Sequence, residues 1–186
     1  MLSSERLDLV PFSDVNRTSV SQTYLKWLND KEVTRLIASP SLQGTADMST
    51  VDEGFRRFTS DSCRGFFILN RDTSEFIGTA KIDKIDLYHS SAELGIMIGE
   101  KAFWGKGISK EVYVSMMKHG FMTMELNRLW GGTNQYNQAM KRTFLSVGFR
   151  QEGILRQANR IDGVFSDSYI YSILRSEYLE RHVYAK

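Results

Sequence analysis

The stretch Gly99-Glu100-Lys101-Ala102-Phe103-Trp104-Gly105-Lys106-Gly107-Ile108-Ser109 lies between an apolar segment and a long amphipathic one. Its glycines at positions 105 and 107 allow the backbone to turn tightly. Successive N–H groups and the start of the following helix can then converge on an anion such as a phosphate. A plain tight turn before a buried helix would use the same glycines, so the loop alone leaves both interpretations open.

Two phosphate-binding patterns are missing from this loop. A Walker loop needs Ser or Thr directly after its lysine, whereas Lys106 is followed by Gly107. A dinucleotide-binding G-x-G-x-x-G needs a third glycine where Lys110 stands. The sequence therefore argues against nucleotide hydrolysis and against dinucleotide binding.

The segments before the loop are typical of strands. Residues 92–98 form an apolar run, and residues 66–69 and 76–82 flank a polar turn, which predicts an antiparallel hairpin. Residues 6–10 alternate polar and apolar side chains up to Pro11, which cannot donate a hydrogen bond to a ladder and suits the end of a strand.

Helical spacing predicts the other elements on both sides of the loop. Apolar residues recur at helical spacing from Tyr24 to Leu28, and Thr50-Val51-Asp52-Glu53 has the pattern of a capping box that opens a second helix. After the loop, a wide apolar face over 108–124 predicts a helix packed on a sheet, and a further helix is expected around 138–146.

Three more strands are expected near the C-terminus, over residues 128–133, 149–157 and 165–174, with Asp162-Gly163 as a hairpin turn. This order of strands and helices predicts a mixed α/β (α+β) fold. The length of 186 residues, without a linker or repeat, predicts one domain over 1–186.

Composition narrows the classes of function. The 24 Lys+Arg exceed the 22 Asp+Glu by only two and are scattered, so we expect no nucleic-acid partner. The single Cys63 excludes an internal disulfide, and a metal site would have to use the dispersed His89, His119 and His182, so we expect no metal. With no signal-peptide pattern or long apolar run, we expect a cytoplasmic protein with no membrane partner.

Several segments together resemble the GNAT superfamily of N-acetyltransferases, in which a loop R/Q-x-x-G-x-G/A cradles the pyrophosphate of coenzyme A. The resemblance covers nearly the whole chain in the right order. Its details are similar to the RimJ/RimL-type branch, which acetylates the N-termini of ribosomal proteins. The segments that carry it are Trp27-Leu28-Asn29-Asp30, residues 93–99, Trp104-Gly105-Lys106-Gly107, residues 134–137 and residues 147–153.

The resemblance implies a mixed, mainly antiparallel sheet of about seven strands flanked by about four helices, with the fourth strand (92–98) and the fifth (128–133) splayed apart. Acetyl-CoA would lie between these two strands, with its pantetheine arm on the backbone of the fourth. The residues implied to bind it are Ile96, Met97, Ile98, Phe103, Trp104, Gly105, Lys106, Gly107, Ile108, Ser109, Asn134 and Asn137. Simple helix capping is an equal alternative for the two asparagines.

Two departures from the family pattern bear on the mechanism. Ala102 stands where the loop has Arg or Gln, and Phe144 stands where a tyrosine commonly protonates the departing thiolate. Another acid is then needed, and water, Tyr136 and Ser109 are the candidates. Glu93 is our candidate general base, acting through water, with a solvated strand carboxylate as the alternative.

The implied reaction is direct attack of a primary amine on the thioester in a ternary complex. The acceptor site should draw on residues 12–58 and on the final hairpin, with Trp27, Asp83 and Asp167 as candidate contacts, although Trp27 is also a typical core residue. A protein N-terminal α-amine is the leading acceptor, followed by a nucleotide-linked amino sugar and by polyamines. A non-catalytic acyl-CoA sensor is the alternative from another class. The sequence also allows a homodimer.

Overall fold

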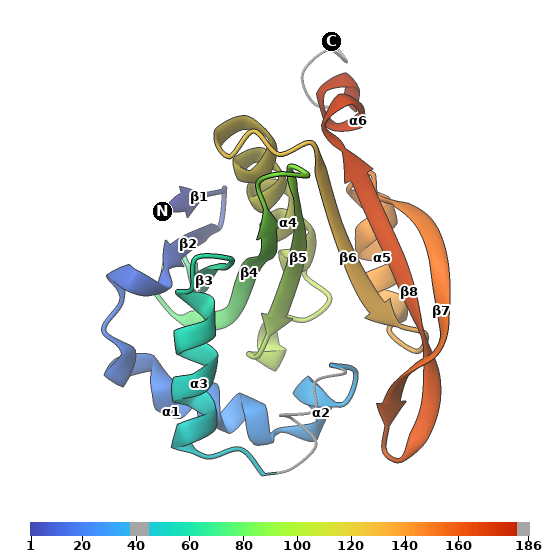
Figure 1. Ribbon diagram of the computed structural model, residues 1–186. Helices are drawn as coiled ribbons and strands as arrows, with labels where there is room; N and C mark the ends of the chain where they lie inside the picture. The colour runs from blue at the N-terminus through green and yellow to red at the C-terminus, as the bar shows by residue number, and fades with distance from the viewer. Residues whose placement is uncertain (38–44, 182–186) are drawn as a thin grey trace.

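One sheet of eight strands organises the residues that the computed structural model describes, 1–37 and 45–181 (Figure 1). The strand order is β1-β2-β3-β4-β5-β6-β8-β7. Among the described strands, only β5 and β6 pair in parallel. The strands are β1 (Leu2–Ser3), β2 (Leu7–Pro11), β3 (Arg64–Asn70), β4 (Phe76–Asp86), β5 (Ser91–Ile98), β6 (Arg128–Asn134), β7 (Arg150–Ile161) and β8 (Val164–Leu174).

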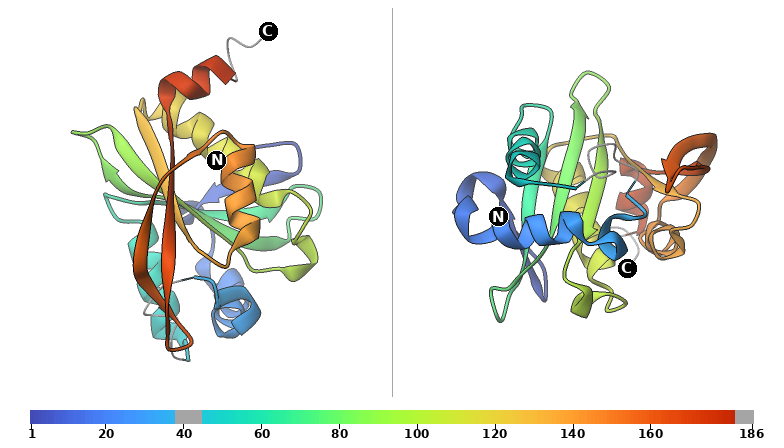
Figure 2. Two further views of the ribbon diagram at one scale, coloured as in Figure 1. Left: turned by 90° about the vertical axis from the view of Figure 1, so that its right-hand side faces the viewer. Right: turned by 90° about the horizontal axis from the view of Figure 1, so that it is seen from below.

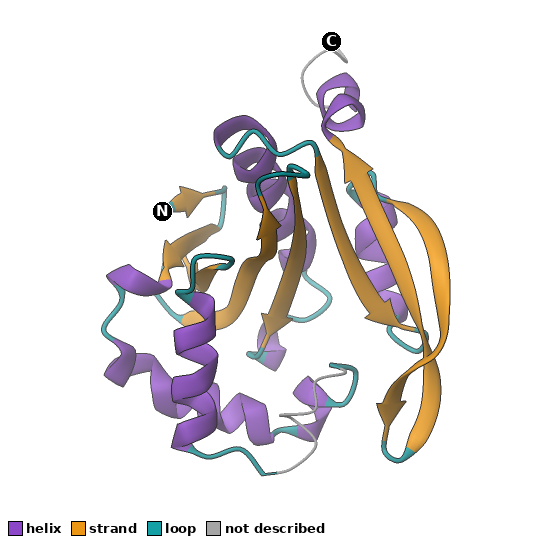
Figure 3. Cartoon of the chain, in the orientation of Figure 1, coloured by secondary structure: helices purple, strands orange, loops and turns teal. Residues whose placement is uncertain are grey.

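Helices cover both faces of this sheet (Figures 2 and 3). One face carries α1 (Arg17–Asn29), the short α2 (Lys31–Thr34) and α3 (Met48–Phe58), and the other carries α4 (Ile108–Lys118) and α5 (Gln138–Ser146). The chain also contains α6 (Arg175–Leu179), 3-10 turns at Phe12–Asp14 and Lys101–Phe103, and a π-helical turn at His119–Thr123. Of the described helices, none is long and apolar enough to cross a membrane.

The fold class predicted from the sequence is confirmed. The predicted numbers of strands and helices are slightly lower than those found in the described residues. The additional strand is β1, and the additional helices are α2 and α6, of two, four and five residues. Elements this short cannot display a period of 2 or 3.6 residues, so hydrophobic patterning does not reveal them.

The apolar run Phe66-Phe67-Ile68 in β3 shows why the central strands do not alternate. Phe66 and Ile68 belong to the core beneath α4 and α5, whereas Phe67 belongs to the core beneath α1 and α3. A strand with helices on both faces buries successive side chains in opposite directions. Phe67 stacks on Phe12 with ring centroids 3.8 Å apart, which ties the 3-10 turn after β2 to the same core.

Helix α3 begins earlier than the sequence predicts. Thr50 was expected to open the helix, but the N-cap is Asp47, whose carboxylate accepts from the backbone N–H of Thr50 at 3.0 Å. The Thr50 hydroxyl in turn accepts from the backbone N–H of Asp47 at 3.3 Å. This reciprocal pair is a capping box with Asp47 as the N-cap, so Thr50 is the third residue of the helix rather than its N-cap.

The hairpin of β7 and β8 turns at Asp162-Gly163, as the sequence predicts. Asp162 and Gly163 have φ of 49° and 82°, the left-handed conformation that a tight two-residue turn requires at both positions. Strand β7 continues to Ile161, beyond the predicted end at Gln157. Its register against β8 shifts between Leu155 and Asn159, so β7 has extra residues there and then resumes its pairing with β8.

Strands β5 and β6 pair over only part of their length, as predicted for the fourth and fifth strands. Their pairing covers Ser91 to Glu93 on β5 and Arg128 to Trp130 on β6, and neither the rest of β5 nor the rest of β6 is paired with the other strand. Beyond Trp130, β6 pairs with β8 on its other side. The sheet is therefore open between β5 and β6, and the gap widens toward their C-terminal ends (Figure 1).

Helix α1 rests on the end of β5 through Trp27 and Gly99. A Cβ atom at Gly99 would lie 1.9 Å from the indole ring of Trp27, so only glycine permits this approach. Trp27 is buried and also packs on Phe76 at 4.6 Å between ring centroids. The contact fixes α1 beside Gly99, the first residue of the segment Gly99 to Ser109, which we call the glycine loop.

We predict that Gly99→Ala destabilises the protein by about 1–3 kcal/mol, because the new methyl group overpacks against Trp27. Thermal unfolding followed by circular dichroism measures this. Gly153→Ala is the matched control, because a Cβ atom at Gly153 would meet nothing within 4 Å. Equal melting temperatures for the two variants would contradict the prediction.

Candidate active site

The glycine loop leads into the N-terminus of α4 and has the backbone geometry of an anion cradle. Gly105 and Gly107 have φ of 72° and 78°, and Gly107 is the N-cap of α4. Glycine has no side chain, so no side chain caps the first N–H groups of this helix. Free N–H groups and the positive end of the helix dipole both favour a bound phosphate.

Arg6, from the turn between β1 and β2, holds this loop from outside. Its guanidinium donates to the carbonyl of Lys106 at 3.1 Å and forms an ion pair with Glu111 at 2.6 Å. Burial opposes ionisation of Glu111, but hydrogen bonds from Ser4 and Arg6 outweigh it, so the Glu111 pKa lies below its usual value. Sequence reasoning missed this clamp because its partners are about a hundred residues apart and share no motif.

Other side chains of the loop are also fixed. The Trp104 indole donates to the carbonyl of Ile98 at 2.9 Å, and the Lys106 amine lies 5.7 Å from the centre of the Phe103 ring. Lys101 pairs with Asp30 at 2.8 Å, and this hydrogen bond raises the Lys101 pKa. The loop is thereby connected to the junction between α1 and α2.

The open edge of β5 presents main-chain groups to the gap. Gly99 donates its N–H to Ile77 on β4, whereas the carbonyls of Leu94 and Ile98 accept from side chains on the other side. Because the direction of backbone groups alternates along a strand, Ile96 and Ile98 face the gap. The backbone of Met97 instead faces β4, where it is opposite Thr79. Of the three predicted backbone contacts to pantetheine, Met97 is thus placed to contribute its side chain only.

The closed end of the gap is filled by aromatic side chains. A Cβ atom at Gly131 would lie 2.8 Å from Cζ of Phe144 and 3.1 Å from the carbonyl oxygen of Leu94. Phe144 is fully buried, and its ring stacks on Tyr171 with centroids 4.8 Å apart. The Tyr113 hydroxyl donates to the Leu94 carbonyl at 3.2 Å, and burial raises the Tyr113 pKa. Sequence reasoning assigned Tyr113 only to the buried helix face.

Of the two asparagines, Asn137 caps a helix and Asn134, the last residue of β6, holds the turn that follows the strand. Asn137 is the N-cap of α5 and accepts from the Met140 N–H at 3.0 Å. Asn134 is buried, donates to the Ser166 hydroxyl at 2.6 Å and accepts from the Tyr136 N–H at 2.9 Å. The capping role that the sequence left open is thus filled by Asn137 and not by Asn134, while a contact of either side chain with coenzyme A stays a prediction.

The candidate acids lie at the open end of the gap. Tyr136 follows β6 and is 57% exposed, and Ser109 is half-buried in the first turn of α4. Within residues 1–37 and 45–181, neither hydroxyl donates to a protein group. Both remain available to a ligand or to water.

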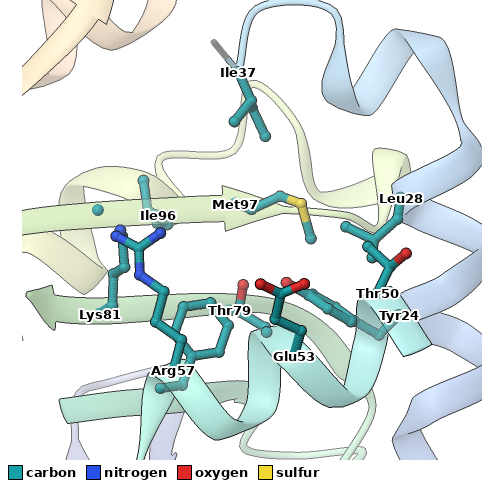
Figure 4. A pocket seen from close by; sticks show the side chains of 13 residues that line it. Tyr24, Leu28, Ile37, Thr50, Glu53, Arg57, Thr79, Lys81, Ile96 and Met97 are labelled. Atoms are coloured by element: carbon teal, nitrogen blue, oxygen red, sulfur yellow. The ribbon is translucent and has the colours of Figure 1, made fainter. Parts of the chain in front are cut away.

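A cavity of about 230 Å³ lies against β4 and β5 beneath α1 and α3 (Figure 4). Its lining is mainly apolar, with Leu28, Ile37, Phe58, Ile96 and Met97 among its walls. Tyr24, Thr79, Glu53, Arg57 and Lys81 add polar groups. Ile96 belongs both to this cavity and to the open edge of β5, so the cavity adjoins that edge.

The walls of the cavity carry both signs of charge. Arg57 and Lys81 both bind Oδ2 of Asp83, at 2.7 and 2.6 Å. Asp83 was expected to meet a cationic amine, but it is 4% exposed and already has two cations, so this expectation is corrected. Burial opposes its ionisation, but Lys81, the Lys84 N–H and Arg57 outweigh it and lower the Asp83 pKa.

Two other polar groups of the cavity lie on α1 and α3. The Tyr24 hydroxyl is hydrogen-bonded to Thr79, and burial raises the pKa of Tyr24 to about 12. The Glu53 side chain extends from α3 into the cavity (Figure 4). In the described part of the chain, Glu53 forms no ion pair. The sequence placed Glu53 in a capping box and gave no sign of its place in the cavity.

Glu93 lies on β5 at the last pair before the gap opens. Its carboxylate forms an ion pair with Lys84 at 2.8 Å, and the Lys84 amine also lies 4.9 Å from the centre of the Trp130 ring. The Glu93 side chain is 21% exposed, so water can reach it. Glu93 does not line the cavity, although it lies only two residues before Gly95, which does.

The remaining predicted contacts lie elsewhere. Trp27 is core, and the side chain of Asp167 accepts from the Gln157 N–H at 2.8 Å within the final hairpin. Of the expected acceptor region, α1 and α3 line the cavity, whereas no described residue of the hairpin does. Residues 38–44 of that region and His182 lie outside the described residues. Within the described ranges, no three His, Cys, Asp or Glu residues are grouped to hold a metal.

A glycine loop at a helix N-terminus, an open strand edge and an adjoining cavity suit an enzyme that holds an extended, phosphate-bearing carrier beside a second substrate. Residues 6–150 match the family model described as "Acetyltransferase (GNAT) domain". The chain therefore belongs to the GNAT acetyltransferase family and is an acetyl-CoA-dependent N-acetyltransferase, which confirms the prediction from the sequence.

Comparison with individual proteins supports the same class. The chain is 27% identical over 172 residues to the uncharacterized N-acetyltransferase p20 of Bacillus licheniformis, covering 92% of this chain and 80% of p20. Its fold is similar to the spermidine N-acetyltransferase of Vibrio cholerae, solved with CoA and spermine (TM-score 0.82, 20% identity, 95% and 99% coverage). It is also similar to RimL, a ribosomal L7/L12 alpha-N-protein acetyltransferase solved with CoA (TM-score 0.79, 17% identity, 92% and 95% coverage). At these identities the two structures establish the fold alone.

We predict that Gly107→Ala raises the KM for acetyl-CoA about tenfold or more, because a Cβ atom disfavours the left-handed backbone that shapes the cradle. Steady-state kinetics with acetyl-CoA as the varied substrate measures this. Gly163→Ala is the matched control, because Gly163 has φ of 82° and belongs to the distant hairpin. Both variants should lose about 1 kcal/mol of stability. An unchanged KM in Gly107→Ala would contradict the prediction.

Proposed function

We propose that this enzyme acetylates the N-terminal α-amine of a peptide or protein. The observation that carries the proposal is the cavity, which adjoins the open edge of β5 and combines apolar walls with the carboxylate of Glu53. Glu53 can attract an ammonium group, and the apolar walls suit the first side chain of a peptide. The comparisons include acetyltransferases for a polyamine and for a protein N-terminus, so the acceptor is argued from this cavity.

The charges of the cavity disfavour a polyamine. Arg57 and Lys81 are both cations and share one carboxylate, Asp83, so this wall has an excess of positive charge. A polyamine carries several positive charges and would be repelled there. An α-amine with one positive charge can be placed at Glu53, away from that wall.

The size of the cavity disfavours a nucleotide-linked amino sugar. Pockets that enclose ligands of drug size occupy about 300–1,000 Å³. A cavity of about 230 Å³ suits an amino-terminal residue and part of the next one, but not a nucleoside diphosphate with its sugar. The presence of an acceptor cavity beside the gap also favours an enzyme over a sensor of acyl-CoA.

The residues present account for each step of a direct transfer. The backbone N–H and carbonyl of Ile96 and the N–H of Ile98 would hold the pantetheine arm as though it were another strand, and the α4 N-terminus would bind its pyrophosphate. The neutral amine forms the new N–C bond as the C–S bond breaks. Glu93 receives the amine proton through water, and water, Tyr136 or Ser109 returns a proton to the thiolate. A thiol with a pKa of about 8.5 is a tolerable leaving group, so water suffices.

The acceptor is tested by following release of free thiol from acetyl-CoA with a panel of amines. The panel consists of a peptide with a free α-amine, the same peptide with a blocked N-terminus and one lysine, spermidine, and a nucleotide-linked amino sugar. We expect the free-α-amine peptide to have the highest kcat/KM. Higher kcat/KM for any other amine, or binding of acetyl-CoA with no thiol release at all, would overturn the proposal.

The role of Glu93 is tested by the pH dependence of Glu93→Gln. We expect kcat/KM to fall about a hundredfold at pH 7, since a general base typically contributes about 10²–10⁴. The deficit should shrink toward pH 9, because an α-amine with a pKa of about 8 then deprotonates by itself. Lys84→Ala is the control, because it removes the ion pair and keeps the base. A rate unchanged from pH 6 to 9, or an equal loss in Lys84→Ala, would exclude Glu93 as the base.

A further inference from the structure

The guanidinium of Arg57 has donors to spare at the cavity. Arginine carries five N–H donors. In the described part of the chain, Arg57 makes one side-chain hydrogen bond, from Nη2 to Asp83 at 2.7 Å, and its side chain is 58% exposed. Arg57 lines the cavity and reaches toward the Lys81 side of it (Figure 4). Most of its donors therefore face solvent or a ligand.

The single carboxylate of Asp83 cannot neutralise the positive charges of both Arg57 and Lys81. Its Oδ2 already receives both Arg57 and Lys81, and its Oδ1 accepts from the backbone N–H of Lys84 at 2.9 Å. Two cations thus share one carboxylate, which leaves one positive charge in excess. An anionic group on a ligand would balance that charge and use the free donors.

Glu53 lies one helical turn before Arg57 on the same helix and lines the same cavity. Side chains four residues apart on a helix are close enough to pair. Yet Arg57 is paired with Asp83 instead, and no ion pair joins it to Glu53. The cavity consequently presents separate negative and positive groups along α3. This arrangement is complementary to an acceptor that carries an ammonium group and a carboxylate close together.

We propose that Arg57 selects acceptors that carry a carboxylate next to the reactive amine. This inference rests on the proposed function, and its primary form is a peptide with Asp or Glu directly after the acetylated residue. Glu53 receives the α-ammonium on binding, and Arg57 receives the carboxylate with bidentate geometry. The same chemistry is offered by the α-carboxylate of a free amino acid, so the experiment separates these two sources.

The test compares three acceptors: Ala-Asp-Gly-amide, Ala-Asn-Gly-amide and free alanine. Thiol release gives kcat/KM for each acceptor. For the unmodified enzyme we expect kcat/KM about tenfold higher for the Asp peptide than for the Asn peptide, because a charge-assisted pair replaces a neutral contact. The difference should lie mainly in KM, since Arg57 binds the acceptor and does not touch the reacting atoms.

Substitutions at Arg57 test whether this residue causes the preference for the Asp peptide over the Asn peptide. In Arg57→Ala the ratio between the Asp and Asn peptides should fall to about one, and in Arg57→Lys it should be intermediate, because the charge remains and the planar fork is lost. Arg56→Ala is the matched control. Arg56 is the neighbouring exposed residue of α3, and among the described residues its side chain bonds only to the Asp52 carbonyl and does not line the cavity. Arg56→Ala should keep the ratio of the unmodified enzyme.

The outcomes separate this inference from the proposed function. Equal kcat/KM for the two peptides in the unmodified enzyme, or a preference that survives in Arg57→Ala, overturns the inference and leaves peptide acetylation standing. Acetylation of alanine alone overturns the proposed function, and its loss in Arg57→Ala upholds recognition of a carboxylate by this residue. Thiol release with none of the three acceptors overturns both.

Discussion

The loss of hydrogen bonding between β5 and β6 in the middle of the sheet is the constraint on which the site depends. Backbone groups in an interior sheet are normally paired, because an unpaired buried group costs free energy. Here the pairing stops after Glu93 and Trp130, and side chains take over part of the work. Tyr113 satisfies the Leu94 carbonyl and Trp104 satisfies that of Ile98. The backbone groups of Ile96 lie between them and face the gap.

The packing of Phe144 against Gly131 explains why the gap between β5 and β6 is filled at one end. Gly131 leaves no side chain between β5 and β6, and the edge of the Phe144 ring occupies that space. Phe144 is in turn held by Tyr171 on β8 and lies 5.3 Å from the ring of Tyr113, measured between centroids. The position at which many family members have a catalytic tyrosine is therefore a packing position in this protein. This agrees with a mechanism in which another group, or water, protonates the thiolate.

The glycine loop is joined by side-chain contacts to α1, which covers the cavity, and to the turn between β1 and β2. Trp27 rests on Gly99, and Lys101 pairs with Asp30, so α1 is attached to the loop at both ends of a short segment. On the other side, Arg6 holds the loop through Lys106 and Glu111. The cavity beneath α1 and α3 is thus held at a fixed position relative to the glycine loop. Direct transfer in a ternary complex requires such a fixed relation between the two substrates.

The sequence by itself indicated the longer elements and the tight glycine loop before α4. Local patterns carry this information, since the glycines at 105 and 107, the Asp162-Gly163 turn and the apolar face of α4 each act through neighbouring residues. Only the tertiary structure decided which side chains meet in the acceptor cavity. Glu53 and Arg57 are four residues apart on α3, but no spacing along the chain relates them to Lys81 on β4 or to Tyr24 on α1. The pairing of Asp83 with two cations was hidden for the same reason: whether a carboxylate is free for a substrate depends on burial and on distant partners.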